Sequence, residues 1–393
     1  MRIVRTGAVL AAASLTLTAC STGPADGGGD DGGESTTTAA GEGSGEGEGS
    51  GSGDASGSGD ASGSGDASGS GEGDAAAFPV TVEHALGKTT IEKQPTRIAT
   101  LGWSDHDVVA ALDVKPVGAP QITWGGNENQ STDWFDKKAN ELDGEITRYS
   151  DADGAPIEEI AELQPDLILA TNSGITPEEY EKLSKLAPVV AYPELAWGTS
   201  WQDSTKLIGQ AMGRSDQAEQ LIKDTEQQIA DTAAKYPELK DTTAAWASFA
   251  ATDLSKFNLY TTTDNRPRML EDLGMVNAPL IGDLSKDASN FMVEVSAEKA
   301  RTVEADVVVF YADETLPADT VVENDLLKDI PAFSRGSYVA ADDPVASYPM
   351  SSPTPLSIPT ALEEFVPQLA EAAKKAKEGG GSGEQPTGES SSE

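Results

Sequence analysis

Hydrophobic and polar positions follow two periods between residues 78 and 377. Short apolar runs at 97–101, 166–170 and 306–311 have the length of buried strands. Between such runs, as at 156–163, apolar positions recur at spacings of three and four, which is typical of helices. Strands that alternate with helices in this way predict an α/β fold with mostly parallel sheets.

The same two periods place the other elements of this region. A hairpin is expected over 80–91, with its turn around Gly87, and Ser104 is expected to cap the helix that follows it. Pro367 is expected to kink the last helix. Further strands are expected at 116–119, 189–192, 244–249, 258–261 and 337–341, and helices at 105–112, 177–186, 269–273, 297–303 and 360–377.

The stretch from 201 to 236 differs from the rest because it contains no strand pattern. Gly213 interrupts the stretch, and apolar positions then recur at helical spacing from Ala218 to Ala233. A surface helix would show the same pattern. Its position between two α/β halves favours a long helix that connects them.

A repeated phrase links these two halves. In each half, a glutamate near a helix start precedes by eight residues the aspartate that opens an apolar strand. These pairs are Glu158 with Asp166 and Glu298 with Asp306, and they lie 140 residues apart. The repeat predicts two related, Rossmann-like lobes joined by one long rigid helix.

The N-terminal segment predicts export. Arg2 and Arg5 precede a short apolar run that ends in Leu-Thr-Ala-Cys at Cys20, the single cysteine among 393 residues. A basic start, an apolar run and a small-residue cleavage site form a secretory signal, and the run is too short to span a bilayer. The ending resembles the lipobox of bacterial lipoproteins, which implies a signal peptide at 1–19 and lipidation of Cys20. A signal peptide with an incidental cysteine is the alternative.

Two segments have compositions that do not build a core. Residues 20–77 are an acidic linker rich in Gly and Ser, with a six-residue Gly-Ser-Gly-Asp-Ala-Ser repeat, and residues 378–393 are a similar tail. We expect both to be disordered, so the core belongs to 78–377.

The charge of the chain narrows the choice of partners. The formal net charge is −39, and about −25 of it belongs to the central region. Nucleic acid binding requires basic side chains that neutralise phosphates, so a nucleic acid partner is not expected. The same charge repels anionic lipid headgroups, so lipid is expected to be the only membrane anchor.

Several phrases together resemble one family, the substrate-binding proteins of siderophore and cobalamin ABC transporters. The phrases lie at 97–103, 158–169, 211–214, 269–274, 296–298 and 326–338. The resemblance implies an N-lobe at about 95–198, a bridging helix at about 201–236 and a C-lobe at about 242–377. It also implies a monomer on the extracytoplasmic face of the cell membrane that delivers a ferric siderophore to an ABC permease. No cofactor, resident metal or catalytic residue is expected.

The resemblance also suggests roles for individual residues. One glutamate on each lobe, Glu158 and Glu298, would dock onto arginines of the permease, and Glu159 is the rival of Glu158. Ligands of this family and of open α/β sheets bind at the carboxyl ends of strands, where aromatic side chains stack on a flat chelate and arginines suit an anionic one. The candidate ligand-binding residues are Trp103, Trp124, Asn172, Tyr192, Trp197, Arg266, Arg268, Tyr311 and Tyr348.

Other ligands and other classes of protein are alternatives. Haem or cobalamin could replace the siderophore in the same fold, and the two histidines, His84 and His106, show no metal-ligand spacing. An exported cell-surface enzyme is the alternative of another class, although the sequence contains no nucleophile elbow, Walker-type phosphate loop or His-Glu-x-x-His motif. A surface adhesin would explain the linker but not the repeat.

Overall fold

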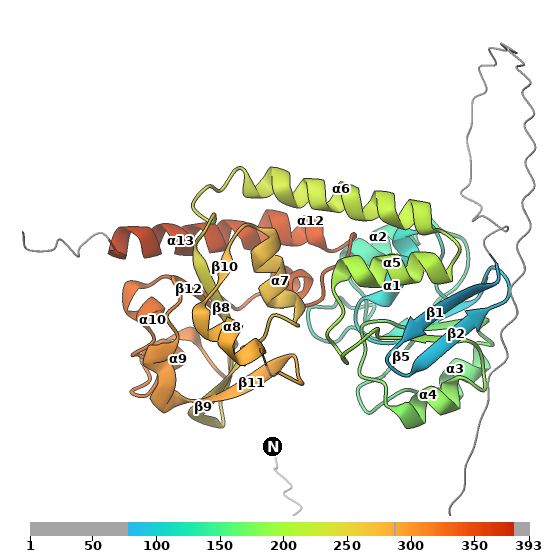
Figure 1. The fold of residues 1–393 in the computed structure, drawn as a ribbon, viewed down its shortest axis with the longest axis horizontal. Helices are drawn as coiled ribbons and strands as arrows, with labels where there is room; N and C mark the ends of the chain where they lie inside the picture. The colour runs from blue at the N-terminus through green and yellow to red at the C-terminus, as the bar shows by residue number, and fades with distance from the viewer. Residues whose placement is uncertain (1–77, 287, 381–393) are drawn as a thin grey trace, which may run out of the picture. The chain divides into compact units, whose positions relative to one another are not determined.

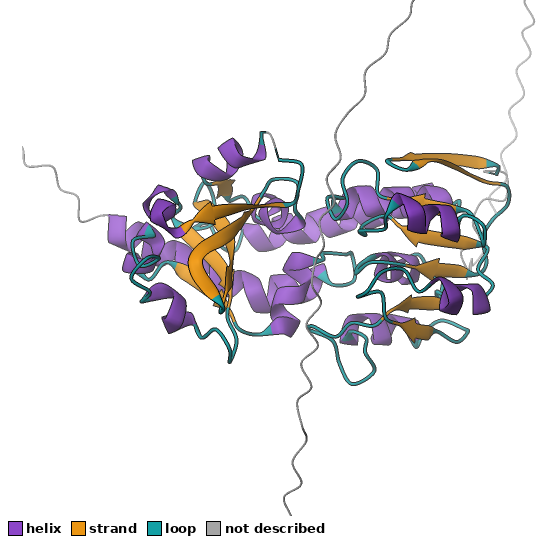
Figure 2. Cartoon of the chain, turned by 90° about the horizontal axis from the view of Figure 1, so that it is seen from below, coloured by secondary structure: helices purple, strands orange, loops and turns teal. Residues whose placement is uncertain are grey.

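A computed structural model describes residues 78–286 and 288–380 of the chain. These residues form two α/β lobes, each with its own main sheet (Figures 1 and 2). The predicted α/β class with two lobes is therefore confirmed. The expected signal peptide at 1–19, Cys20 and the linker up to residue 77 lie outside the described residues. The disordered tail was expected at 378–393, but the last helix extends to Gly380, and only residues 381–393 lie outside the described residues.

The N-lobe is built on a five-stranded parallel sheet with the order β5-β4-β3-β6-β7. The chain runs outward from β3 on both sides, so the strand order reverses between β3 and β6, which is where open α/β sheets bind ligands. The expected hairpin, β1 (Val80–His84) and β2 (Gly87–Ile91), is confirmed. The other elements are β3 (Ile98–Thr100), α1 (Asp105–Ala111), β4 (Gly118–Pro120), α2 (Asp133–Ala139), β5 (Thr147–Tyr149), α3 (Ile157–Glu162), β6 (Leu167–Ala170), α4 (Pro177–Leu183) and β7 (Val189–Ala191).

The C-lobe contains a mixed sheet with the order β11-β9-β8-β12-β13, and β10 pairs beside β8. Strand β9 runs antiparallel to both neighbours, because a tight turn joins it to β8. The expectation of mostly parallel sheets thus holds for the N-lobe and only for part of the C-lobe. The elements are β8 (Thr243–Ala250), β9 (Asp253–Tyr260), α7 (Asn265–Asp272), β10 (Val276–Asn277), α8 (Pro279–Ser285), β11 (Met292–Ser296), η2 (Ala297–Thr302), β12 (Val307–Tyr311), α9 (Ala318–Val322), α10 (Pro331–Arg335), β13 (Tyr338–Ala341), α11 (Pro344–Ser351), α12 (Ile358–Thr360), η3 (Ala361–Phe365) and α13 (Val366–Gly380).

The expected helix over 201–236 is two helices, α5 (Trp201–Ala211) and α6 (Ser215–Ala233). Gly213 has a φ of +67° just after α5, the left-handed conformation that commonly ends a helix. Helix α5 packs on α1 and β1 and belongs to the N-lobe, so of these two helices it is α6 that connects the lobes (Figure 1). Ala218 near its start lies in the N-lobe core, whereas Ile229 near its end lies in the C-lobe core.

A second connection between the lobes is made by the segment after α11. The hydroxyl of Thr354 donates to Asp107 on α1 at 2.8 Å, and Leu356 packs against the small core around Phe135 of α2. The hydroxyl of Tyr348 on α11 donates to the backbone carbonyl of Trp103 at 2.7 Å. The lobes are therefore joined by α6 and by side-chain contacts from residues 348–356, which lie far beyond α6 in the sequence.

The repeated phrase has the same structural role in both lobes. Asp166, before β6, accepts from the backbone N–H groups of Thr96 and Arg97, which lead into the neighbouring strand β3. Asp306, before β12, accepts from the backbone N–H of Thr243, the first residue of the neighbouring strand β8. Each aspartate thus joins the starts of two adjacent parallel strands, which explains why the phrase occurs once in each lobe.

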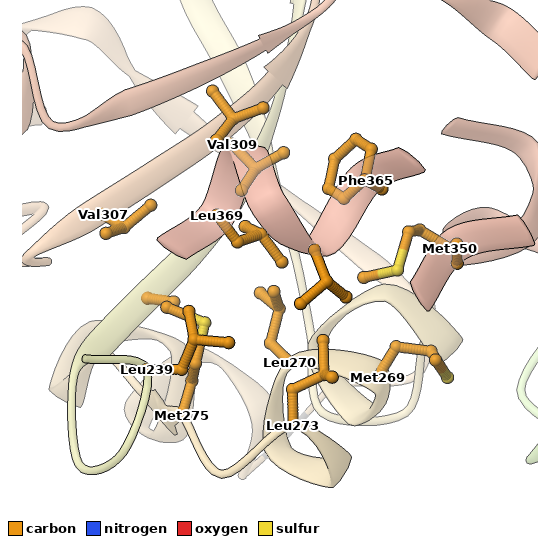
Figure 3. Packing of buried hydrophobic residues seen from close by; sticks show 14 of the residues in the cluster. Leu239, Met269, Leu270, Leu273, Met275, Val307, Val309, Met350, Phe365 and Leu369 are labelled. Atoms are coloured by element: carbon orange, nitrogen blue, oxygen red, sulfur yellow. The ribbon is translucent and has the colours of Figure 1, made fainter. Parts of the chain in front are cut away.

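The larger core cluster of the C-lobe includes strand β12 and the C-terminal helices (Figure 3), and a second cluster packs on the other side of the same strand. Val307 and Val309 of β12 pack with Phe365, Leu369 and Leu270, all of them fully buried. The last helical stretch contains a π-turn, η3, in which the N–H of Val366 donates to the carbonyl of Ala361. Pro367 follows directly and has no N–H to donate, so the expected distortion near this proline is present as a π-turn.

Two local predictions differ from the structure. Ser104 precedes α1, but its side chain makes no capping hydrogen bond. The expected helix at 297–303 is the 3-10 helix η2. Several elements were not predicted, because they are short and lack a clear period: α2, β5, α8, β10, β11, α9, α10 and α11. Among the described residues, no helix is long and apolar enough to cross a membrane.

Candidate ligand-binding site

A cavity of about 460 Å³ lies between the lobes and is lined by residues of both. Its volume falls in the range of small-molecule sites, roughly 300–1,000 Å³. In the N-lobe the lining comes from the segments that follow all five parallel strands. Trp103 follows β3, Trp124 follows β4, Asp151 follows β5, Asn172 follows β6 and Trp197 follows β7. The cavity thus opens at the strand-order reversal of the sheet, as the sheet topology predicts.

The turn after β3 directs Trp103 into this cavity. Gly102 has a φ of +80°, and a Cβ at this position would collide with the backbone carbonyl of Asn172. Its N–H donates to Asp151 Oδ2 at 3.0 Å, so the ends of β3, β5 and β6 are held together. Only glycine combines this conformation with so close a backbone approach. The indole of Trp103 is 38% exposed, which is unusual for so large an apolar group.

Aromatic rings from both lobes form one wall of the cavity. The Tyr348 ring stacks on Trp103, with centroids 5.8 Å apart and planes 14° apart. Trp124 lies beside both rings, at 6.5 Å from Trp103 and 6.1 Å from Tyr348. Tyr311 from β12 meets Trp124 edge-on at 5.4 Å. These distances are those of favourable ring pairs, so the wall is an extended surface on which a flat or apolar ligand could pack.

One arginine lines the cavity, and it is already paired. Arg266 Nη1 lies 2.8 and 3.0 Å from the two carboxylate oxygens of Asp264, and Nε donates to the Tyr311 hydroxyl at 2.6 Å. Its guanidinium also lies 4.1 Å from the centre of the Tyr260 ring. Burial raises the pKa of Asp264, and the adjacent Arg266 opposes this rise. The position of Arg266 is therefore fixed by protein groups on several sides.

Two asparagine oxygens at the cavity wall have no hydrogen-bond partner among the described residues. They are Oδ1 of Asn172 and Oδ1 of Asn265, and both side chains are more than nine-tenths buried. The amide of Asn265 donates to the Thr199 carbonyl at 2.9 Å, which fixes the direction of its oxygen. Buried acceptors without a donor are costly, and both oxygens are covered by protein atoms, so they weaken the wall locally and are not open to the cavity.

Behind the aromatic wall lies a buried polar cluster on α1. Asp107 Oδ2 accepts from Trp134 Nε1 and from the Thr354 hydroxyl, both at 2.8 Å. Burial raises the pKa of Asp107 to about 6, and burial also raises the pKa of Asp105 to about 6. Burial lowers the pKa of His106 well below its usual value. Since Trp134 contacts Tyr348, this cluster supports the wall without facing the cavity.

The structure brings most of the predicted ligand residues together. Those that line the cavity are Trp103, Trp124, Asn172, Trp197, Arg266 and Tyr348. Tyr311 lies directly behind, in contact with Trp124 and Arg266. Tyr192 is packed in the N-lobe core, with its hydroxyl on the Ile175 carbonyl, and Arg268 donates to the Gly198 carbonyl at 2.8 Å. Neither Tyr192 nor Arg268 lines the cavity.

Other lining residues were missed by the sequence reasoning. Asp151 follows β5 and Phe291 precedes β11, two strands that were not predicted. Asp264 and Asn265 lie at the start of α7, where the side chain of Asp264 accepts from the Arg266 N–H as an N-cap. An aspartate two residues before an arginine at a helix start was the one available signal for this pair.

The two candidate docking glutamates occupy matching positions. Glu158 is the second residue of α3, Glu298 is the second residue of η2, and both side chains are exposed. The neighbouring Glu159 is also exposed. Among the described residues, no group of three His, Cys, Asp or Glu side chains is arranged to hold a metal ion.

Fold and site together define a two-lobed binding protein that holds a small molecule between its lobes. The sequence profile of the periplasmic binding protein family matches residues 98–345, so the chain belongs to this family of substrate-binding proteins.

Individual relatives and solved structures are also similar to this chain. "Probable siderophore-binding lipoprotein YfiY" of Bacillus subtilis (strain 168) is 27% identical over 279 residues, which cover 67% of this chain and 81% of YfiY. "Fe(3+) dicitrate-binding periplasmic protein FecB" of Escherichia coli (strain K12) is 29% identical over 208 residues, 52% of this chain and 63% of FecB. The structure of Streptococcus pneumoniae TIGR4 PiaA in complex with ferrichrome is 36% identical, covers 75% of this chain and 99% of PiaA, and has a TM-score of 0.70.

Proposed function

We propose that the protein binds a ferric siderophore in the cavity between its lobes and delivers it, as a monomer, to an ABC permease. The aromatic wall of the cavity carries this proposal. Trp103 and Trp124 offer ring faces that the buried Tyr348 of the C-lobe supports from behind, and the bulky organic shell of an iron chelate would pack on them. The names of YfiY, FecB and the ferrichrome complex of PiaA support the same class of ligand.

The protein acts by binding and release and does no chemistry on its ligand. Closure of one lobe on the other around a ligand is a common motion of such proteins. Haem and cobalamin are the competing ligands. A haem iron needs an axial His or Tyr, and among the described residues no histidine lines the cavity, while the Tyr348 hydroxyl already donates to a backbone carbonyl.

Glu158 and Glu298 form the permease-docking groups of this proposal. Both are exposed at the starts of equivalent helices, one on each lobe, and carboxylates that pair with arginine forks fix the orientation of a partner. Lipidation of Cys20 is the proposed anchor on the extracytoplasmic face of the membrane. The Leu-Thr-Ala-Cys ending and the lipoprotein name of YfiY support it. Mass spectrometry of the membrane-bound protein would detect the lipid on Cys20.

Tryptophan fluorescence of the purified chain tests the ligand class. Trp103, Trp124 and Trp197 line the cavity, so an absorbing ligand there should quench their emission. The chain is titrated with ferric siderophores, with the iron-free siderophores, with haem and with cobalamin. Saturable quenching by a ferric siderophore is the expected result. Saturation by haem or cobalamin alone would refute the proposed ligand, and no response to any of these ligands would refute the proposed function.

A further inference from the structure

The charged groups of the cavity wall indicate which ferric chelates the protein accepts. This inference rests on the proposed function. The ionisable carboxylate and guanidinium groups that line the cavity are those of Asp151, Asp264 and Arg266, and no lysine lines it in the described part of the chain. One cation and two carboxylates leave the wall without excess positive charge. Arg268, the other candidate for binding an anion, lies outside the lining.

The charge of Arg266 is balanced within the protein. Asp264 is only 4% exposed and lies against the guanidinium with both carboxylate oxygens. A buried ion pair of this kind presents little net field to a third group, because the two charges nearly cancel beyond their separation. An anionic chelate entering the cavity would lose its hydration without gaining an unpaired cation.

The aromatic side chains of the wall give a second argument. Ring faces suit an uncharged organic shell or a cation. Charge balance and the aromatic wall therefore both favour uncharged or cationic chelates.

We propose that Asp264 determines charge selectivity: by pairing with Arg266 it makes the cavity accept uncharged or cationic ferric chelates and disfavour anionic ones. Hydroxamate chelates belong to the accepted class, because three hydroxamate anions balance the charge of ferric iron. Ferric citrate and ferric tris-catecholates, which keep a negative charge, belong to the disfavoured class. Removing the Asp264 charge would leave Arg266 as an unbalanced cation in the wall.

Titration of the full chain with chelates of different charge tests this role. The probes are ferrichrome, which is uncharged, ferrioxamine B, which is cationic, and ferric dicitrate and a ferric tris-catecholate, which are anionic. The natural chain should bind one of the first two at least about tenfold more tightly than either anion. In Asp264→Asn, this preference should shift toward the anions by at least about tenfold, and added salt should weaken the gained affinity. Asparagine is also a good N-cap, so α7 should keep its start.

Two further variants separate the explanations. Asp151→Asn removes a carboxylate from the same cavity without freeing an arginine, so its preference should shift much less than that of Asp264→Asn. The double variant Asp264→Asn/Arg266→Gln has a neutral pair again and should return toward the natural preference. Equal or tighter binding of the anions by the natural chain, or an unchanged preference in Asp264→Asn, would overturn the role of Asp264 while the siderophore function stands. No binding of any ferric chelate would overturn both.

Discussion

Asp107→Asn should stabilise the protein at neutral pH and leave its stability unchanged in acid. Asp107 is 1% exposed, and burial raises its pKa from 3.8 to about 6. Between these values the folded state holds a proton that the unfolded state has lost, so stability is highest below about pH 4 and falls as the pH rises through 6. A shift of about two pKa units costs about 3 kcal/mol at pH 7.

The asparagine side chain can keep the contacts of Asp107. Its carbonyl can accept from Trp134 and Thr354, as Oδ2 does now. Its amide would lie where Oδ1 is, 3.5 Å from His106 Nε2, and Oδ1 has no hydrogen-bond donor among the described residues. Arg148 favours the ionised carboxylate and so limits the rise in the pKa of Asp107. The gain at pH 7.5 should therefore approach, and not exceed, about 3 kcal/mol.

Urea unfolding followed by fluorescence between pH 4 and 8 measures this difference. Asp136→Asn, on the neighbouring helix α2, is the matched control because the pKa of Asp136 is shifted in the opposite direction. Burial alone would raise the pKa of Asp136, but hydrogen bonds from Ser131, Asn129 and Asn127 outweigh it and lower the pKa. This control should lose stability across the whole range from pH 4 to 8, because the lowered pKa keeps Asp136 ionised in the folded state there. A stability difference for Asp107→Asn that does not change with pH, or a loss of stability at pH 7.5, would refute the reasoning.

Three other predictions concern the site, the repeat and the docking surface. Trp103→Ala should weaken ligand binding about tenfold or more in fluorescence titrations, with little change in melting temperature, because the exposed ring stabilises the ligand more than the fold. Asp166→Ala and Asp306→Ala should each lower the unfolding free energy by about 1–3 kcal/mol, since strand-opening N–H groups lose their acceptor; equal stability of both variants to the natural chain would contradict this. Glu158→Arg and Glu298→Arg should reduce cellular iron uptake while ligand affinity in vitro is unchanged, and unimpaired uptake would argue against docking.

The sequence alone was sufficient to predict a helix or strand where a short segment has a strong hydrophobic pattern of its own. The apolar run of β12 predicts a strand wherever it is placed, because it is long enough and entirely apolar. Strand β5 and helix α2 have three and seven residues and no clear period, so the sequence did not predict them. The loop after β5, which carries Asp151 into the cavity, was missed with them.

The sequence also determined the two-lobe plan, through the paired phrases at Asp166 and Asp306. Each phrase is local, and each aspartate reaches only the adjacent strand. Which strands run antiparallel in the C-lobe was decided by the short turn between β8 and β9. The sequence reasoning did not recognise that turn, and it extended the parallel pattern of the N-lobe to both sheets.

Only the tertiary structure decided which candidates share the cavity. Arg266 and Arg268 are two residues apart on α7, and side chains at this spacing point to different sides of a helix. Arg266 therefore reaches the cavity and Asp264, while Arg268 reaches the Gly198 carbonyl. Sequence identifies the arginines and aromatic residues, since these are properties of the residues themselves. Whether an arginine in the cavity is free or already neutralised depends on groups brought together by folding, and no local pattern contains that information.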